Sequence, residues 1–312
     1  MPNNKPKLVV ITGPTASGKS SLAIELALYF GAEIISADSM QVYRGMNVGT
    51  AKATVQERRG IPHHLIDMVN PDEEFNAALY RSHAAPLIME GATGGRLFFL
   101  VGGTGLYIKT LLGGLLRSPP SDSKLREKLR QECQEHGTAF LYARLKERDP
   151  AYALTIHPND RVRLIRALEI THLTQKRLSS LIKNHKFRER PFGTLKICLQ
   201  MDREELYHRI NKRSLAMIED GLLEETEGLI SKGYSLELKP MKSLGYRHMA
   251  KVLDETWKMD EAIRRLQTDT RRYAKRQLTW FRSDPEMLWK RPEKIGDMIK
   301  VIKEFYGEIY RQ

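Results

Sequence analysis

A glycine-rich loop of eight residues near the N-terminus constrains the fold of this chain more than any other feature. Its sequence is Gly13-Pro14-Thr15-Ala16-Ser17-Gly18-Lys19-Ser20. The apolar run from Leu8 to Thr12 precedes it, and residues 20–30 carry apolar side chains at helical spacing. Strand, loop and helix in this order define a P-loop, whose backbone N–H groups bind phosphate oxygens. Lys19 adds a point charge, and Ser20 is the candidate Mg²⁺ ligand.

Two further apolar runs have the length of strands and end at polar or glycine-rich segments. The run from Glu33 to Ala37 ends at Asp38, and the run from Leu97 to Val101 ends at Gly102-Gly103-Thr104-Gly105. In open α/β sheets the ligand lies beyond the carboxyl ends of the strands. We therefore expect Asp38 and Thr104 to face the same crevice as the P-loop.

The middle of the chain has a helical character. Composition changes at Ser118-Pro119-Pro120-Ser121-Asp122, and helical patterns then cover 124–136, 138–148 and 161–175. Asp160 is placed to cap the last of these. An alternating strand pattern returns from Thr194 to Met201.

These patterns predict an α/β fold in which a P-loop core with a parallel sheet is interrupted by a mostly helical insertion domain. The core takes residues 1–117 and 191–312, and the insertion takes residues 118–190. We expect the second part of the core to end in basic helices, and the insertion to swing on its Pro119-Pro120 and Arg190-Pro191 connections.

The excess of basic residues lies outside the P-loop segment. The formal net charge is +13, and residues 116–312 hold 41 Lys and Arg against 29 Asp and Glu, whereas residues 1–115 are nearly balanced. Phosphates neutralised by Lys and Arg release counterions, so this asymmetry indicates a polyanionic partner. A solvated basic surface that serves solubility is the alternative.

Composition disfavours a membrane protein and a disulfide framework. No apolar run approaches the ~20 residues of a membrane span, and the first residues lack the apolar stretch of a signal peptide, so we expect a cytoplasmic protein. Cys133 and Cys198 lie far apart in the sequence, so we expect both to be free thiols. The pair His63-His64 lies in a segment without Cys, which favours packing or hydrogen bonding over a metal site.

A P-loop alone is typical of nucleotide hydrolases and kinases, and that class stays open. Those enzymes place an Asp on the metal at the end of an apolar strand, whereas the run from Leu97 ends in glycine. Asp38 is the better candidate for the working acid or base. A cap, or a surface turn before Ser39, is the alternative role of its carboxylate.

A basic helix is predicted from about residue 260 to residue 282. Four cations spaced by seven, four and seven residues line one face: Arg264, Arg271, Lys275 and Arg282. Four apolar or aromatic residues line another face, which we expect to pack against the core: Ile263, Leu266, Tyr273 and Trp280. Arg163 and Arg166 form an i, i+3 pair in the insertion. A solvated face is the usual explanation, but few acids and the aromatic pair Trp280-Phe281 favour contact with a nucleic-acid backbone.

Together these segments resemble the tRNA dimethylallyltransferase family, also called tRNA isopentenyltransferases, in its bacterial form. The motifs that carry the resemblance are GPTASGKS at 13–20, SADSMQVY at 36–43, GTAK at 49–52, PHHLID at 62–67, VGGTGLY at 101–107, DRVRLIRALE at 160–169, GYR at 245–247 and RRYAKRQLTWFR at 271–282. Ala53 departs from the pattern where many relatives have Pro, and His248 departs where an acidic residue is common.

The resemblance implies transfer of a dimethylallyl group from dimethylallyl diphosphate to N6 of adenosine 37, on the 3′ side of the tRNA anticodon. Mg²⁺ is the implied cofactor, and N6-dimethylallyladenosine and diphosphate are the products. The P-loop would then hold a prenyl diphosphate in place of ATP, and the implied partners are this donor and the anticodon stem-loop. A monomer is expected.

The chemistry gives the site residues their expected roles. Adenine N6 is a poor nucleophile because its lone pair is delocalised, so Asp38 is expected as a base, worth ~10²–10⁴-fold. Lys19 and, by resemblance, Arg213 would stabilise the departing diphosphate, and Thr104 would position the extruded base. The residues implied to contact tRNA are Asp38, Ser39, Met40, Gln41, Thr104, Arg126, Val162, Arg163, Leu164, Ile165, Arg166, Lys242, Gly245, Tyr246, Arg247, Arg271, Lys275 and Arg282.

Overall fold

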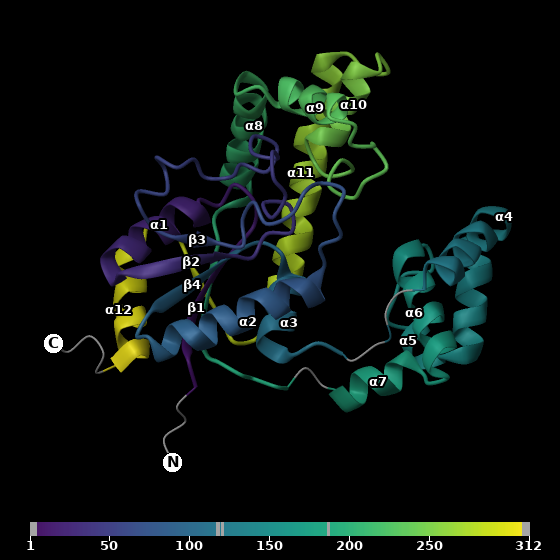
Figure 1. The fold of residues 1–312 in the computed structure, drawn as a ribbon, viewed down its shortest axis with the longest axis horizontal. Helices are drawn as coiled ribbons and strands as arrows, with labels where there is room; N and C mark the ends of the chain where they lie inside the picture. The colour runs from purple at the N-terminus through teal and green to yellow at the C-terminus, as the bar shows by residue number, and fades with distance from the viewer. Residues whose placement is uncertain (1–4, 117–118, 120–121, 186–187, 308–312) are drawn as a thin grey trace. The chain divides into compact units, whose positions relative to one another are not determined.

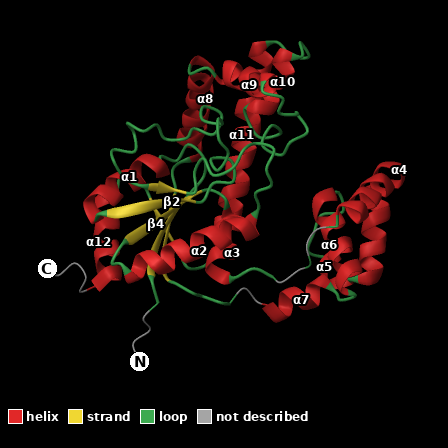
Figure 2. Cartoon of the chain, viewed as in Figure 1, coloured by secondary structure: helices red, strands yellow, loops and turns green. Residues whose placement is uncertain are grey.

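The chain divides into two compact units, Met1–Leu112 with Pro191–Gln312, and Gly113–Arg190. The computed structural model describes residues 5–116, 119, 122–185 and 188–307. Figure 1 shows the course of the chain, and Figure 2 marks its helices and strands. The first unit boundary lies five residues before the predicted one. The predicted junction at 117/118 and part of the Pro119-Pro120 connection lie outside the described residues.

A parallel six-stranded sheet forms the centre of the first unit, in the order β3-β2-β4-β1-β5-β6. Its strands are β1 (Lys7–Thr12), β2 (Ala32–Ser36), β3 (His63–His64), β4 (Leu97–Gly102), β5 (Gly193–Leu199) and β6 (Met287–Lys290). The four strands predicted from apolar runs are present within one or two residues of their predicted ends. The short edge strands β3 and β6 were not predicted, since two to four residues carry too little pattern.

Helices cover both faces of this sheet because its strands alternate their side chains between two cores. Val9 and Ile11 of β1 belong to one core, with α1 (Lys19–Phe30) and α12 (Ile295–Tyr306). Leu8 and Val10 belong to the other, with α2 (Ala77–Thr93) and α3 (Gly105–Gly113). Both faces of the parallel sheet are therefore buried, as its near-continuous apolar strands require.

Four helices extend the second core away from the sheet: α8 (Arg203–Glu219), α9 (Leu222–Ser231), α10 (Tyr246–Leu253) and α11 (Met259–Arg282). Helix α11 matches the predicted basic helix. Its buried line, however, runs through Ala262, Leu266, Ala274, Gln277 and Phe281. The prediction of Trp280 on the packing face is wrong, since Trp280 is 38% exposed and Phe281 takes the core position.

Within the described part of the second unit, all regular elements are helices. It contains α4 (Ser123–Arg148), α5 (Pro150–Ala153), α6 (Arg161–Thr174) and α7 (Leu178–His185). Gly137 interrupts α4 with a non-helical backbone, which matches the two helices predicted on either side of it. The carboxylate of Asp160 caps α6 by accepting the N–H of Arg163, as predicted. Leu141, Leu145 and Leu164 are fully buried in a separate core.

Candidate active site

The P-loop runs from the end of β1 to the start of α1. Gly18 caps this helix in the left-handed region, with φ of 80°, and Ala16 also has a positive φ of 63°. These residues turn the backbone around the helix N-terminus. Such a terminus presents free N–H groups and the positive end of the helix dipole, which together favour a bound anion.

Two cations border this loop. Lys19 Nζ lies 3.4 Å from the carbonyl oxygen of Pro14, and Arg213 Nη1, from α8, donates to the hydroxyl of Thr15 at 3.1 Å. Burial, followed by the charge of Arg213, lowers the pKa of Lys19 to about 8, while the charge of Asp38 opposes both effects. Because neighbouring cations repel each other, an anion bound beside them would stabilise both charges.

The lowered pKa of Lys19 predicts a pH-dependent affinity for diphosphate. Lys19 is charged below a pH of about 8 and loses its proton as the pH rises through that value. We expect the advantage of the wild type over Lys19→Ala in binding inorganic diphosphate to shrink between pH 7 and pH 9. Calorimetric titrations of both proteins across this range measure it, and a ratio of dissociation constants that does not change with pH would contradict the assignment.

Gln277 of α11 joins the P-loop to the end of β4. Its Oε1 accepts the N–H of Thr15 at 2.8 Å, and its Nε2 donates to the carbonyl oxygen of Gly103 at 3.0 Å. A Cβ at Gly103 would collide with this amide, which explains the glycine. Gln277 had no predicted role, although an uncharged amide inside a basic helix is a signal for one.

Asp38 follows β2 at the carboxyl end of the sheet. Its Oδ1 accepts the N–H groups of Met40 at 2.8 Å and Gln41 at 3.4 Å, so the turn role considered as an alternative is present. Thr104 supports this turn, because its hydroxyl accepts the N–H of Ser39 at 3.0 Å. The charge of Asp38 also acts on Lys19, so the carboxylate lies near the P-loop cation as well.

Two cavities meet beside Asp38. The larger, of about 330 Å³, extends toward α8, α10 and α11, and the smaller, of about 80 Å³, extends along Lys19 and Ser20. The residues that line both cavities are Thr15, Asp38, Thr50, Arg213 and Tyr273. A carboxylate and a guanidinium therefore lie where the two spaces join. Burial and the charge of Asp38 raise the pKa of Tyr273, so its hydroxyl is a neutral donor there.

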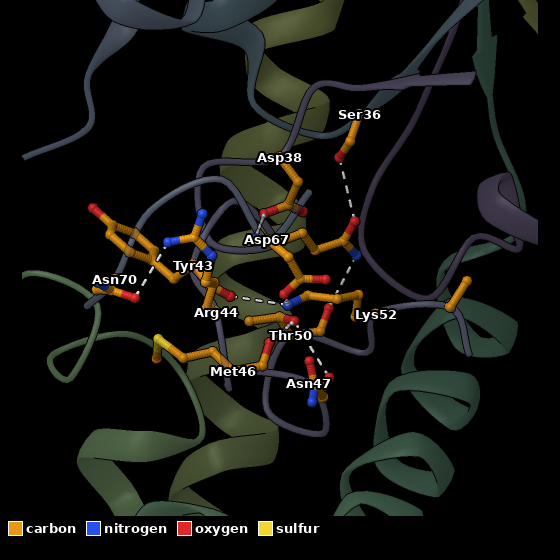
Figure 3. A network of polar contacts seen from close by, with 12 residues as sticks. Ser36, Asp38, Tyr43, Arg44, Met46, Asn47, Thr50, Lys52, Asp67 and Asn70 are labelled. Atoms are coloured by element: carbon orange, nitrogen blue, oxygen red, sulfur yellow. Dashed lines mark hydrogen bonds and ion pairs between the residues drawn. The ribbon is translucent and has the colours of Figure 1, made fainter. Parts of the chain in front are cut away.

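A loop of residues 46–53, which we call the junction loop, forms part of both cavity walls. Figure 3 shows its polar contacts: Lys52 Nζ donates to the carbonyl oxygen of Tyr43 at 2.9 Å and pairs with Asp67. Gln41 Nε2 donates to the carbonyl oxygen of Thr50 at 3.2 Å. The buried ammonium of Lys52 thus holds the loop from inside, a role that the GTAK motif alone did not reveal.

Comparison with known proteins identifies the family. The family model described as IPP transferase matches residues 41–284, and the one described as isopentenyl transferase matches residues 6–69. A tRNA dimethylallyltransferase of Geobacter sulfurreducens is 47% identical over 97% of this chain and 98% of its own length. The chain belongs to the tRNA dimethylallyltransferase family.

Solved structures of the family have the same fold. A tRNA isopentenylpyrophosphate transferase from Bacillus halodurans is 40% identical, with a TM-score of 0.71 over 96% of this chain and 97% of that one. A eukaryotic dimethylallyltransferase, described as acting on tRNA, is 31% identical, with a TM-score of 0.79 over 96% of this chain and 77% of that one. The α/β fold predicted from the sequence is confirmed by these matches.

Several residues that the family resemblance assigned to tRNA lie around the larger cavity of the transferase. Ser39, Met40, Lys242, Gly245 and Arg247 line it. Gln41 lines the smaller cavity. Tyr246 has no exposed surface, and its side chain cannot be reached by RNA in this structure.

The predicted basic face of α11 is divided. Lys275 and Arg282 are exposed, whereas Arg271 donates to Asn211 of α8 at 3.1 Å.

In the helical unit the assigned residues also separate into surface and interior. Val162 is 79% exposed, and the Arg163 side chain is 57% exposed beside Asp160. Leu164 and Ile165 are 0% and 7% exposed and pack in the core, so the assignment of their side chains to tRNA does not fit. Alternate faces of one helix explain the difference, since residues 162 and 163 point away from the side that packs.

The two remaining arginines of this unit bind a buried carboxylate. Arg126 Nε and Arg166 Nη1 donate to Glu169 at 2.9 Å and 2.6 Å, and Glu169 has no exposed surface. The backbone N–H of Asp122 donates to the same side chain. A buried carboxylate needs such partners, so Arg126 and Arg166 stabilise the unit whatever else they bind.

Metal-binding chemistry is sparse in the described part of the chain. No group of three His, Cys, Asp or Glu side chains there is arranged to hold an ion. His63 Nδ1 lies 2.9 Å from the carbonyl oxygen of Ile61 and His64 Nε2 lies 2.6 Å from Glu33, which confirms hydrogen bonding as their role. Ser20 borders the smaller cavity, and its hydroxyl suits Mg²⁺, which takes its other ligands from phosphates and water. None of the described helices has the length and apolar character needed to cross a bilayer.

Proposed function

We propose that this chain transfers the dimethylallyl group of dimethylallyl diphosphate to N6 of adenosine 37 in tRNA. The products are N6-dimethylallyladenosine and diphosphate. One observation carries the proposal: a phosphate-binding loop and a larger cavity meet at a single carboxylate, Asp38. The family membership supports the proposal, because relatives that match nearly the whole length of this chain are named for this activity.

The donor would bind at the P-loop end. The backbone N–H groups at the start of α1, the ammonium of Lys19 and the guanidinium of Arg213 are positioned for its diphosphate. Mg²⁺, held by the Ser20 hydroxyl and diphosphate oxygens, would neutralise part of the charge on the leaving group. The prenyl carbon bonded to oxygen would then face the junction beside Asp38.

The acceptor base would enter the larger cavity. A volume of about 330 Å³ admits a purine ring, and the cavity is bordered by the basic residues Lys239, Lys242, Arg247 and Arg276. An adenosine must leave its stack to reach the junction, at a cost of a few kcal/mol that is smallest in a single-stranded loop. The anticodon loop meets that condition.

At the junction, one bond forms as another breaks. The N6 lone pair attacks the prenyl carbon, the carbon–oxygen bond breaks, and its electron pair leaves with diphosphate. Asp38 accepts the proton that N6 loses. Lys19 and Arg213 stabilise the charge that grows on the leaving oxygen, as preorganised cations do in other group transfers. We propose a monomeric enzyme that acts on tRNA in the cytoplasm.

An assay with competing donors tests the function. The protein is incubated with unmodified tRNA and either dimethylallyl diphosphate or ATP, and the RNA fragments are weighed by mass spectrometry. We expect a mass increase of one dimethylallyl group and stoichiometric diphosphate release, both dependent on tRNA and Mg²⁺. ATP consumption stimulated by tRNA, with no effect of the prenyl donor, would favour a hydrolase or kinase instead.

The exposed cations of the two units predict the salt dependence of tRNA binding. Replacing Arg163, Lys275 or Arg282 by glutamine should lower the slope of log K against log salt by up to ~1 each, because each loses one phosphate contact. Arg166→Gln and Arg271→Gln should also lower the thermal midpoint, since both side chains bind protein partners. Lys300→Gln, on the exposed side of α12, serves as the control. Five unchanged slopes would place the tRNA elsewhere.

A further inference from the structure

The carboxylate of Glu225 binds three consecutive backbone N–H groups of the junction loop. Its Oε2 accepts the N–H of Asn47 at 2.8 Å and that of Val48 at 2.9 Å, and its Oε1 accepts the N–H of Gly49 at 3.1 Å. Consecutive N–H groups that converge in this way form a small anion-binding site. Here a side chain of the protein, from the first turns of α9, occupies that site.

Tyr246 completes the arrangement from α10. Its hydroxyl donates to Glu225 Oε1 at 2.5 Å, and the residue has no exposed surface. The tyrosine ring lies where a Cβ on Gly49 would be, so any larger residue at position 49 would collide with it. Burial and the neighbouring Glu225 charge raise the pKa of Tyr246, so the hydroxyl stays a donor.

The junction loop that this contact holds borders both cavities. Gly49 and Thr50 line the larger cavity, and Thr50 and Ala51 line the smaller one. Arg247, the next residue after Tyr246, lines the larger cavity as well. The Glu225 carboxylate therefore connects the junction loop to α10, the helix that borders the larger cavity.

We propose that Glu225 and Tyr246 are positioning residues that hold the junction loop as the shared wall of the two cavities. They thereby set the approach of the acceptor base to the donor, an assignment that rests on the proposed prenyl transfer. The P-loop has separate anchors in Gln277 and Arg213, so loss of the Glu225 contact should leave the diphosphate end intact. Activity and diphosphate affinity should then respond differently.

Glu225→Gln tests this separation. Glutamine keeps one acceptor oxygen, but its amide group would turn donors toward the N–H groups of the loop. We expect kcat for prenyl transfer to fall by about 10-fold or more, while the Kd of inorganic diphosphate stays within about 2-fold. Glu224→Gln is the matched control, since Glu224 is an exposed neighbour in the same helical turn.

Tyr246→Phe is the second variant, and it keeps all three bonds from the loop to Glu225. We expect a smaller loss of kcat with the same unchanged Kd of diphosphate. The double variant should lose no more than Glu225→Gln alone, because both side chains act through one loop. If Glu225→Gln does not fold, Tyr246→Phe alone decides by the same two measurements.

Two results would overturn the proposal. One is a kcat of both variants within about 2-fold of the wild type, and the other is a loss of diphosphate affinity in proportion to kcat, as general destabilisation would cause. Absence of tRNA-dependent diphosphate release from the wild type is a different failure. It would refute the proposed reaction itself and not the positioning role alone.

Discussion

Asp38→Asn is expected to lower turnover by at least ~10²-fold, which is the size of a lost general base. The asparagine Oδ1 can still accept the N–H groups of Met40 and Gln41, so the turn after β2 survives. We therefore expect tRNA affinity to stay within a few-fold of the wild type. Single-turnover measurements of RNA mass, with both substrates saturating, separate the chemical step from binding.

Asp38→Ala serves as the comparison, because alanine removes the turn acceptor together with the base. It should be at least as slow as Asp38→Asn and should also show a lower thermal midpoint. A wild-type rate for Asp38→Asn, with a slow Asp38→Ala, would leave Asp38 as a turn residue only. Another group at the junction would then have to accept the N6 proton.

Lys19→Ala and Arg213→Ala are each expected to slow the chemical step by roughly 10²–10³-fold, as loss of one charge-stabilising donor does elsewhere. Both should also weaken binding of the prenyl diphosphate, because its charge is present in the ground state and grows in the transition state. Inhibition by inorganic diphosphate measures the first effect, and single-turnover rates measure the second.

Lys212→Ala is the matched control for Arg213→Ala, since Lys212 is the exposed neighbour in the same helix. It should leave both quantities unchanged. Equal inhibition of the wild type and of both site variants by diphosphate would show that the leaving group lies elsewhere. The cations beside Thr15 would then have a structural role.

The phosphate-binding end of the site could be predicted because its parts are contiguous. The strand, the glycine loop and the helix lie within residues 7–30, and their order alone dictates converging N–H groups. Asp38 and Thr104 were also predictable as neighbours, since parallel strands bring their carboxyl ends to one edge. The alternative roles of Asp38 could not be separated, because both need the same residue at the same strand end.

The rest of the site depends on residues that meet only after folding. Arg213 and Gln277 contact Thr15 of the P-loop although they lie 198 and 262 residues away in sequence, and Tyr273 lines the same cavity. Local periodicity says which side chains of a helix share a face, but not which face finds a partner. On α11, therefore, only the structure shows that Phe281 packs into the hydrophobic core while Trp280 stays exposed.

The sequence by itself determined the P-loop, the strand ends that form the crevice, the helical insertion and the family. Only the tertiary structure decided which residues of the family motifs are available to a ligand. Leu164, Ile165 and Tyr246 are buried by packing, whereas Arg163 and Arg247 remain accessible. Gly49 is explained by the ring of Tyr246 from α10, which fills the space that a larger side chain would need. Short-range order follows from the backbone and from neighbouring residues, whereas burial depends on contacts that the chain makes with distant parts of itself.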